Sequence, residues 1–451
     1  MSKNQVTRRE LLKLLGMSTV ATSLAGGLHV RQAQADMVET KNAKRGHLYD
    51  GSEAAPCRLD ANGNIVRPET LVPEVQTTDV LVLGGGTAGC AAAIAAARAG
   101  VKVTLVERYN HFGGLATGGL VLIILGHWTE GKKIQVCQGI GEEMMARLEK
   151  LPYGIVNRKP GANPTIDAEA YKYLLVEMLT EAGVDIWLHS LATDAIVSDN
   201  TVRGVVFQTK TGPQAILAKQ TIDTTGDGDI FASAGAAYDR RDYHIGLPAR
   251  IGDVPKMQPG QKRPRNYGDL TPIDDIRWLN MRGKTTDGLD AKNLSNLELE
   301  YRKKIWQNYI TLREQEGFGD VKMIETAPQL GVRITRVLKG VVELTREGAE
   351  NNVKFDDCVG LGGAWFGDHQ AWQLPLRALL PEKIDNLLTA GRSISTDPRM
   401  SDLIRVIPNC WVSGQGAGCA AAAAVLQDVL VRNVDYSKLR QILVDQNVYL
   451  G

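Results

Sequence analysis

The chain has 451 residues, with 52 Lys and Arg against 51 Asp and Glu. This length is enough for two packed domains, and the charge balance argues against a nucleic-acid binder, which carries an excess of basic residues. Hydrophobic residues make up 43% and charged residues 23% of the chain, which is typical of a folded globular protein and excludes a disordered chain or a membrane bundle.

Glycine and cysteine carry further information. The 47 glycines exceed the usual share of about 7%, which indicates backbone that approaches a ligand closely.

No two of the six cysteines are spaced as CxxC, so no haem c, iron–sulfur or zinc motif is present. An even count permits disulfides in an exported protein, but Cys90 and Cys419 lie in Ala-rich helical patterns, where we expect small buried side chains.

The first 35 residues are typical of an export signal. A basic region with Arg8 and Arg9 precedes a weakly apolar run at 14–30 and the sequence Ala33-Gln34-Ala35, in the order n-region, h-region and cleavage site. The paired arginines resemble a twin-arginine signal, cleaved after Ala35; a Sec signal or a retained amphipathic anchor is the alternative. Since twin-arginine export carries folded proteins, we expect a periplasmic protein with a cofactor inserted before export. The remainder carries 47 basic and 50 acidic residues, so the mature protein is mildly acidic.

A βαβ unit follows a polar, turn-rich arm at 36–76. Residues 79–83 form a continuous apolar run suited to a buried parallel strand, 87–99 a small-residue helix, and 101–106 a second strand. No other segment of the sequence has the roughly 18 consecutive apolar residues that a membrane span needs.

The turn of this unit predicts a dinucleotide site. Residues 84–89 fit GxGxxG: Gly84 allows the tight turn, Gly86 lets a pyrophosphate approach, and Gly89 lets the helix pack on the sheet. Backbone N–H groups at the helix start bind phosphates. Glu107 closes the second strand, where a carboxylate can accept both hydroxyls of an adenosine ribose.

The residues after Glu107 favour FAD over NAD. Residues 108–120 read RYNHFGGLATGGL, with glycine pairs at 113–114 and 118–119. Here the chain resembles the flavoproteins with two dinucleotide-binding domains, in which a Gly-Gly turn after the strand-end Glu lies along the FAD. His111 stands roughly where covalently flavinylated relatives of fumarate reductase attach FAD, but its neighbours differ, so we expect non-covalent FAD.

Four further motifs, in order, resemble the FAD-dependent oxidoreductase family over about residues 78–427. Residues 222–229 (IDTTGDGD) are similar to the family's DATGDGD turn, 331–336 (GVRITR) to GVRESRR, and 385–393 (DNLLTAGRS) to DNLLVAGRCIS. Residues 405–410 (RVIPNC) with 414–418 (GQGAG) resemble RVMPTC followed by GQAAG. The resemblance implies a Rossmann-like FAD-binding domain of the glutathione-reductase type, in the α/β class, with an inserted α+β cap domain for substrate.

These motifs also have a physical interpretation of their own. Asp227 or Asp229 could hold a ribityl or ribose hydroxyl, or could cap the helix that we expect to begin at Ile230. The glycines at 414–418 are predicted to open an Ala-rich helix at 419–430, whose N-terminus would stabilise negative charge on the reduced flavin. Close helix packing through small residues is the alternative, and Gly391 would let a buried strand pass close to the flavin.

The two inserted stretches differ in pattern. Residues 110–220 alternate helix and strand signals, with a helix after 139–141, another capped by Asp167, and a hairpin around 211–213 whose strands are 202–208 and 214–218. Residues 235–330 are predicted to be the cap, and a charged helix from Ser295 to about Glu316 would begin with a capping box of Ser295 and Glu298.

Candidates for catalysis are polar residues near the flavin-facing motifs. Arg405 is preferred, because an arginine before the glycine-rich segment could bind a substrate carboxylate or carbonyl, or the flavin O2; an ion pair between cap and FAD domain is the alternative. His369 could donate a proton, and Arg333 could position cofactor or cap. The family's His-rich stretch before RVMP is replaced by 397–403 (DPRMSDL), so no family catalytic His can be carried over. Arg336, and more weakly Tyr243 and His244, are further candidates.

The sequence therefore predicts an exported FAD-dependent oxidoreductase that passes a hydride between flavin N5 and a small organic substrate. No second GxGxxG follows a strand, so we expect electrons to be exchanged with a separate redox protein or a quinone. An NAD-linked Rossmann dehydrogenase and a non-catalytic flavin-binding subunit are the alternatives.

The predicted organisation comprises a signal peptide at 1–35, an arm at 36–76, an FAD-binding domain at 77–234, a cap at 235–330, and a return to the FAD-binding domain at 331–451. The predicted catalytic residues are Arg405, His369 and Arg333. The predicted cofactor-binding residues are Gly84, Gly86, Thr87, Ala88, Gly89, Glu107, Arg108, Gly113, Gly114, Thr225, Gly226, Asp227, Gly391, Arg392, Gly414, Gln415 and Gly418.

Overall fold

The computed structural model describes residues 57–67, 69, 71–129, 134–363 and 371–451. The predicted export signal, the first part of the arm and the candidate His369 lie outside the described residues. Among the helices of the described part, we find none with the length and hydropathy to cross a membrane.

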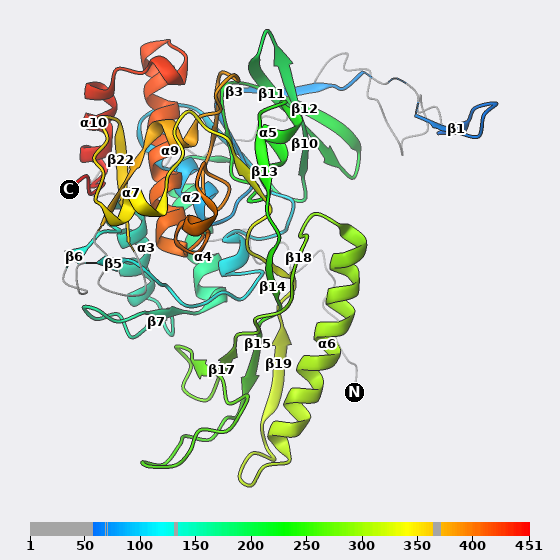
Figure 1. Ribbon diagram of the computed structural model, residues 1–451, viewed down its shortest axis with the longest axis vertical. Helices are drawn as coiled ribbons and strands as arrows, with labels where there is room; N and C mark the ends of the chain where they lie inside the picture. Colours follow the sequence, from blue (N-terminus) through cyan, green and yellow to red (C-terminus); the bar gives the residue numbers. More distant parts are fainter. Residues whose placement is uncertain (1–56, 68, 70, 130–133, 364–370) are drawn as a thin grey trace, which may run out of the picture. The chain divides into compact units, whose positions relative to one another are not determined.

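A mixed seven-stranded sheet forms the centre of the fold (Figure 1). Its order is β10 (Leu191–Ser198), β11 (Thr201–Thr209), β12 (Gly212–Asp223), β3 (Glu74–Leu83), β4 (Val103–Val106) and β9 (Asp185–Trp187), with β24 (Leu387–Thr389) also paired to β12. The pairs that involve β3, β4, β9 and β24 are parallel, and the β10-β11-β12 ladder is antiparallel. This agrees with the expected α/β class; the glutathione-reductase subclass and the domain boundaries stay predictions.

Strands β3 and β12 are longer than the sequence indicated. Apolar runs predicted strands at 79–83 and 214–218, but β3 begins at Glu74 and β12 runs without a break to Asp223. The first half of β3 is polar, and it becomes a strand because it pairs in parallel with 215–218 of β12. Non-local pairing of this kind leaves no hydrophobic period to detect.

Helices α2 (Thr87–Arg98) and α9 (Ile407–Gln427) pack against each other through small residues. A Cβ atom on Gly414 would lie 2.1 Å from the carbonyl oxygen of Ala88, and one on Gly418 would lie 2.2 Å from that of Ala92. The prediction that 414–418 open a helix is therefore wrong. The helix begins at Ile407, so these glycines lie in its interior, and the alternative of close helix packing holds.

Helix α4 (Ala168–Glu181) begins as predicted. Its N-cap Asp167 accepts hydrogen bonds from the backbone N–H groups of Glu169 and Ala170 at 2.9 and 3.0 Å. The other oxygen of Asp167 pairs at 2.8 Å with Arg250, which lies in residues 235–332, here called the inserted segment, and both side chains are about nine-tenths buried. One carboxylate thus caps a helix and joins the inserted segment to the sheet domain.

The inserted segment contains two small sheets and one long helix. The sheets have the orders β18 (Thr285–Thr286), β14 (Tyr243–Gly246), β20 (Gly331–Val332), and β16 (Asp269–Leu270), β17 (Arg277–Leu279), β15 (Ala249–Gly252), β19 (Lys322–Thr326). Helix α6 (Ala291–Arg313) runs beside β19 (Figure 1).

The predicted capping box of α6 is wrong. The helix begins four residues earlier, and Asp290 is its N-cap, accepting from the N–H groups of Lys292 and Asn293 at 2.8 and 3.1 Å. Ser295 donates to the carbonyl of Ala291 at 2.7 Å, and Glu298 pairs with Arg302 at 2.9 Å. Asp290 therefore supplies the cap, and Ser295 and Glu298 lie inside the helix.

The remaining described elements are shorter or peripheral. They are β1 (Arg58–Leu59), β2 (Ile65–Val66), β5 (Trp128–Thr129), β6 (Ile134–Gln135), α3 (Gly139–Glu149), β7 (Ile155–Val156), β8 (Thr165–Ile166), α5 (Asp229–Ser233), β13 (Tyr238–Arg240), β21 (Arg336–Leu338), α7 (Arg346–Glu350), β22 (Cys358–Gly362), β23 (Trp372–Pro375), α8 (Ser401–Ile404) and α10 (Tyr436–Asp445), with 3₁₀ turns at 114–116, 376–379, 398–400 and 431–433. No disulfide joins the six cysteines, and Cys90 and Cys419 are buried as expected.

The α2–α9 contact predicts a stability difference between two glycine substitutions. Gly414→Ala should lower the free energy of unfolding by roughly 1–3 kcal/mol, because the new methyl group meets rigid backbone. Gly319→Ala is the matched control, since nothing lies within 4 Å of its Cβ position. Denaturant unfolding followed by circular dichroism checks both variants. Equal midpoints would show that α9 can move away from α2 at no cost.

Candidate functional site

A cavity of about 1000 Å³ lies at the carboxyl ends of the parallel strands. Its wall contains the residues that follow β3, β4, β12 and β24, together with residues of the inserted segment from β14, β20 and their neighbours. Ligands of open α/β sheets bind at this edge. The cavity is therefore the place to test for a dinucleotide.

The glycine turn after β3 leaves no room for a side chain at Gly84 or Gly89. Gly84 has a φ of +100°, and its Cβ would lie 2.6 Å from the carbonyl oxygen of Thr224. A Cβ on Gly89 would lie 1.8 Å from the Gly84 carbonyl oxygen, so Gly89 serves helix packing and lies behind the wall. Gly84, Gly86, Thr87 and Ala88 form the wall itself.

The start of helix α2 fits a phosphate. Its N-cap Gly86 has no side chain, and no side chain caps the helix. The first N–H groups of a helix need acceptors from outside the helix. An anionic pyrophosphate supplies acceptors and also interacts favourably with the helix dipole.

Glu107 lies on the cavity wall at the end of β4, and is only 6% exposed. Its Oε2 accepts from the N–H of Gly85 at 2.6 Å and its Oε1 from the N–H of Tyr109 at 2.7 Å. Burial raises the pKa of this carboxyl, although these two backbone donors oppose the rise. Each oxygen keeps acceptor capacity for a hydroxyl group. Arg108, the next residue, also lies on the wall.

The second glycine turn sits directly on the first. Gly113 has a φ of +97°, and its N–H donates to the carbonyl of Gly85 at 2.8 Å. A Cβ on Gly114 would lie 2.9 Å from the Cα of Gly86. Gly114 reaches the wall, whereas Gly113 lies behind it against Thr117.

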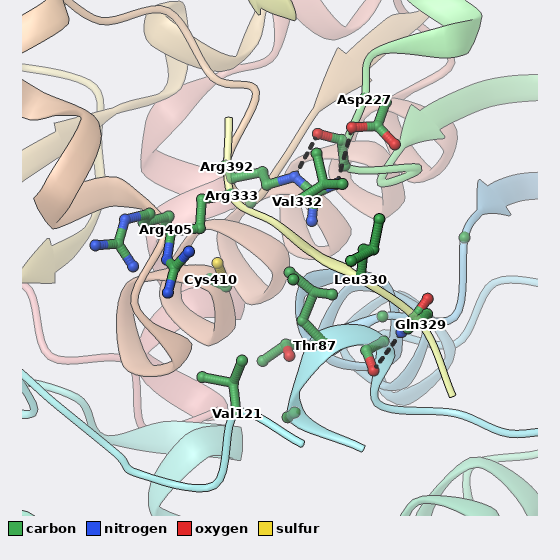
Figure 2. Close-up of a pocket in the computed structure, with 18 of the residues that line it drawn as sticks. Thr87, Val121, Asp227, Gln329, Leu330, Val332, Arg333, Arg392, Arg405 and Cys410 are labelled. Carbon is green, nitrogen blue, oxygen red and sulfur yellow. Dashed lines mark hydrogen bonds and ion pairs between the residues drawn. The ribbon is translucent and has the colours of Figure 1, made fainter. Parts of the chain in front are cut away.

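The turn after β12 is held by a partly buried ion pair. Arg392 donates through Nε to the carbonyl of Gly226 at 2.8 Å and through Nη2 to Oδ1 of Asp227 at 2.9 Å (Figure 2). Burial alone would raise the pKa of Asp227, but Arg392 and a hydrogen bond from Thr335 hold it below its usual value. Thr225, Gly226, Asp227, Gly391 and Arg392 all lie on the wall.

The predicted cap of the following helix, by Asp227 or Asp229, is wrong. Asp223 takes this role, because its Oδ2 accepts from the N–H groups of Ile230 and Phe231 at 3.0 and 2.9 Å. Burial raises the pKa of Asp223 to about 6, against the effect of these donors. Asp229 instead pairs with Arg336 at 2.9 Å. The chain must fold back over seven residues to bring Asp223 to this helix, so local spacing could not reveal it.

Five predicted cofactor residues lie outside the wall of this cavity: Gly89 and Gly113, as described above, and Gly414, Gln415 and Gly418. Gly414 and Gly418 face α2, as described above, and Gln415 accepts from the N–H of Ile140 at 3.0 Å and donates to the carbonyl of Gln446 at 3.0 Å. The first turn of α9 reaches the cavity instead, through Ile407 and Cys410. The assignment of Gly414, Gln415 and Gly418 to cofactor contact is therefore corrected to packing. His111 also lies off the wall, and non-covalent FAD stays a prediction.

Arg405 and Arg333 both reach the cavity (Figure 2). Arg405 forms an ion pair with Asp402 and lies over the ring of Tyr243, 5.7 Å from its centroid. Arg333 donates to the carbonyl of His244 at 2.9 Å. Burial, and next the charge of Arg405, lower the pKa of Arg333 to about 10. Arg336, the further arginine candidate, forms an ion pair with Asp229 at 2.9 Å.

Sequence reasoning missed Arg282 and Asp402. Arg282 lies on the wall and contacts Nε2 of His244. It stands in the inserted segment, which has no motif to mark it. Asp402 belongs to the stretch where the chain departs from the family pattern, and only its contact with Arg405 shows its part in the site.

A family model described as "FAD dependent oxidoreductase" matches residues 79–244 and 246–443. The tRNA uridine 5-carboxymethylaminomethyl modification enzyme MnmG of Geobacter sulfurreducens is 30% identical over 200 residues, which cover 40% of this chain and 28% of that protein. The thiamine thiazole synthase of Metallosphaera sedula is 28% identical over 242 residues, or 50% of this chain and 76% of that protein. The chain thus spans less than half of the MnmG proteins it matches.

Solved structures with a similar fold include a geranylgeranyl bacteriochlorophyll reductase-like protein from Thermoplasma acidophilum. It is 15% identical, with a TM-score of 0.46 and coverage of 83% of this chain and 84% of that one. The flavin-dependent brominase Bmp2 is also 15% identical, with a TM-score of 0.46 and coverage of 82% and 84%.

The contacts of Glu107 predict its effect on cofactor affinity. Glu107→Gln should weaken FAD binding roughly 10- to 100-fold. Both oxygens of Glu107 accept hydrogen bonds from backbone N–H groups, and the NH₂ group of Gln would place a donor against one of these N–H groups. Flavin fluorescence during reconstitution of the deflavinated protein measures the dissociation constant. Glu149→Gln, on the surface of α3, is the control. Unchanged affinity in both variants would limit Glu107 to shaping the turn.

Proposed function

The chain belongs to the FAD-dependent oxidoreductase family, and from this premise we propose that it transfers a hydride between its FAD and a small organic substrate after export to the periplasm. The observation that carries the proposal is the shared cavity. The turn residues that fit FAD and the side chains of Arg333 and Arg405 line the same wall.

The residues present fit FAD as the cofactor. Uncapped helix amides, two stacked glycine turns and a strand-end carboxylate surround one end of the cavity. When bound, FAD supplies a hydride acceptor or donor at flavin N5, and the protein supplies binding, orientation and electrostatics.

Arg405 is the residue that we propose to bind and orient the substrate. Asp402 and Tyr243 fix one side of its guanidinium group, while its Nε is buried without a hydrogen-bond partner among the described residues. A fixed donor of this kind stabilises a substrate oxygen on which negative charge grows, and it needs no rearrangement during the reaction. Arg333 adds a second positive charge beside it.

The proposed electron partner and the proposed periplasmic location are supported by the sequence. No second glycine fingerprint follows a strand, which supports exchange with a separate redox protein or a quinone. The paired arginines at 8–9 support twin-arginine export. An NAD-linked dehydrogenase does not agree with the FAD-dependent family, and a non-catalytic flavin-binding subunit is the alternative that turnover must exclude.

Substitution of Arg405 tests the catalytic proposal. Arg405→Gln should lower the rate at which the best substrate bleaches or reoxidises the flavin by roughly 10²–10³-fold, with normal FAD content. Anaerobic stopped-flow absorbance measures this rate. Arg440→Gln, an exposed arginine on α10, should retain the wild-type rate. Wild-type turnover in Arg405→Gln would remove Arg405 from the mechanism, and the absence of any compound that reacts with the flavin would favour the non-catalytic subunit.

Substitution of the paired arginines tests the proposed export. Replacement of both Arg8 and Arg9 by Lys should keep the protein in the cytoplasm in its uncleaved form, because the translocation signal is lost. Cell fractionation and the mass of the mature N-terminus check this. A periplasmic, cleaved double variant would indicate a Sec signal instead.

A further inference from the structure

Three arginines from different segments line one side of the cavity. Arg282 lies between β17 and β18, Arg333 follows β20, and Arg405 follows α8. Strand β14 pairs with both β18 and β20, so this small sheet brings Arg282 and Arg333 around His244. Figure 2 shows Arg333 and Arg405 on the same side of the cavity, away from Gln329.

The local charge at this cluster is positive. Asp402 is the carboxylate in contact with it, and although burial alone would raise its pKa, hydrogen bonds from Tyr243 and Arg405 lower it, so Asp402 is ionised at neutral pH. A guanidinium group only donates, so His244 accepts from Arg282 at Nε2 and carries its proton on Nδ1, which donates to Thr285 at 2.9 Å. Neutral His244 adds no charge, and three positive groups face one negative group.

The other carboxylates on the wall already have partners. Glu298 pairs with Arg302, Asp269 with Arg263, Asp227 with Arg392, and Asp229 with Arg336, at 2.8 to 2.9 Å. Glu107 is held by backbone N–H groups. Arg108 also lies on the wall, next to Glu107, where its charge acts against the rise in the pKa of that carboxyl. Among the described residues of the wall, the positive charge in excess of the carboxylates therefore lies at the arginine cluster.

Two neighbouring guanidinium groups repel each other, and the lowered pKa of Arg333 shows this cost together with that of burial. The buried Nε of Arg405 has no acceptor among the described residues. A carboxylate supplies both a countercharge and acceptors in the geometry that guanidinium groups match. A neutral substrate would leave the repulsion and the unpaired donor in place.

We propose that the substrate is a small organic acid whose carboxylate groups bind among Arg282, Arg333 and Arg405. This inference names the substrate class of the proposed function and rests on it. The excess of two positive charges favours a dicarboxylate over a monocarboxylate. Since the residues that fit FAD follow β3, β4, β12 and β24, the arginines that follow β17, β20 and α8 are available for substrate.

Calorimetric titration of the FAD-loaded protein tests the inference without turnover. Succinate, propionate and the neutral diamide succinamide serve as probes. Succinate should bind at least tenfold more tightly than propionate, and succinamide should bind more weakly than either acid. Arg282→Gln and Arg405→Gln should each weaken succinate binding roughly 10- to 100-fold with unchanged FAD content. Arg440→Gln should have no effect.

Several results would overturn the inference. They are equal affinity for succinate and succinamide, dissociation constants weaker than about 10 mM for both acids, or loss of FAD without loss of succinate affinity in the arginine variants. Arg282 is exposed, so its variant remains informative if Arg405→Gln does not fold. Acid binding without any flavin turnover would support the site while contradicting the proposed function. Turnover of a neutral compound with no acid binding would support the proposed function while contradicting the acid-binding site.

Discussion

The close contact between the ends of β3 and β12 is the constraint on which the site depends. A Cβ on Gly84 would lie 2.6 Å from the carbonyl oxygen of Thr224, and Thr224 donates its hydroxyl to the carbonyls of Leu83 and Gly84, each at 2.8 Å. Gly89 packs on the same backbone, so α2 starts at this point, and its first residues, Thr87 and Ala88, lie on the cavity wall. The second glycine turn then rests on the first, and the cofactor site follows from this one close approach.

Charge divides the cavity into two ends. At the end made by the strand termini, carboxylates are matched by Arg392, by Arg336 or by backbone N–H groups, so the wall is fixed before any ligand arrives. At the end made by the inserted segment, guanidinium groups outnumber carboxylates. A rigid, neutralised cofactor end and a cationic end suited to an acid are consistent with one cavity that holds two molecules for reaction.

Where the sequence misled, tertiary contacts override a local signal. The glycines at 414–418 resemble a helix start, yet Pro408 in the first turn of α9 marks the true beginning, and the glycines exist because the Ala88 and Ala92 carbonyls leave no room for Cβ atoms. Asp290, not Ser295, caps α6. In both cases more than one residue had the right chemistry, and packing chose between them.

The sequence by itself determined the βαβ unit, its glycine turn with Glu107, the hairpin before Asp223 and the FAD-dependent family, because these depend on local spacing and backbone freedom. It also placed Arg333 and Arg405 near the flavin-facing motifs. Only the tertiary structure decided that Asp223 caps α5, that Asp227 is matched by Arg392, and that Arg282 joins the cluster. These outcomes depend on contacts between residues far apart in the chain, since charge complementarity and packing act through space and leave no periodic trace in the sequence.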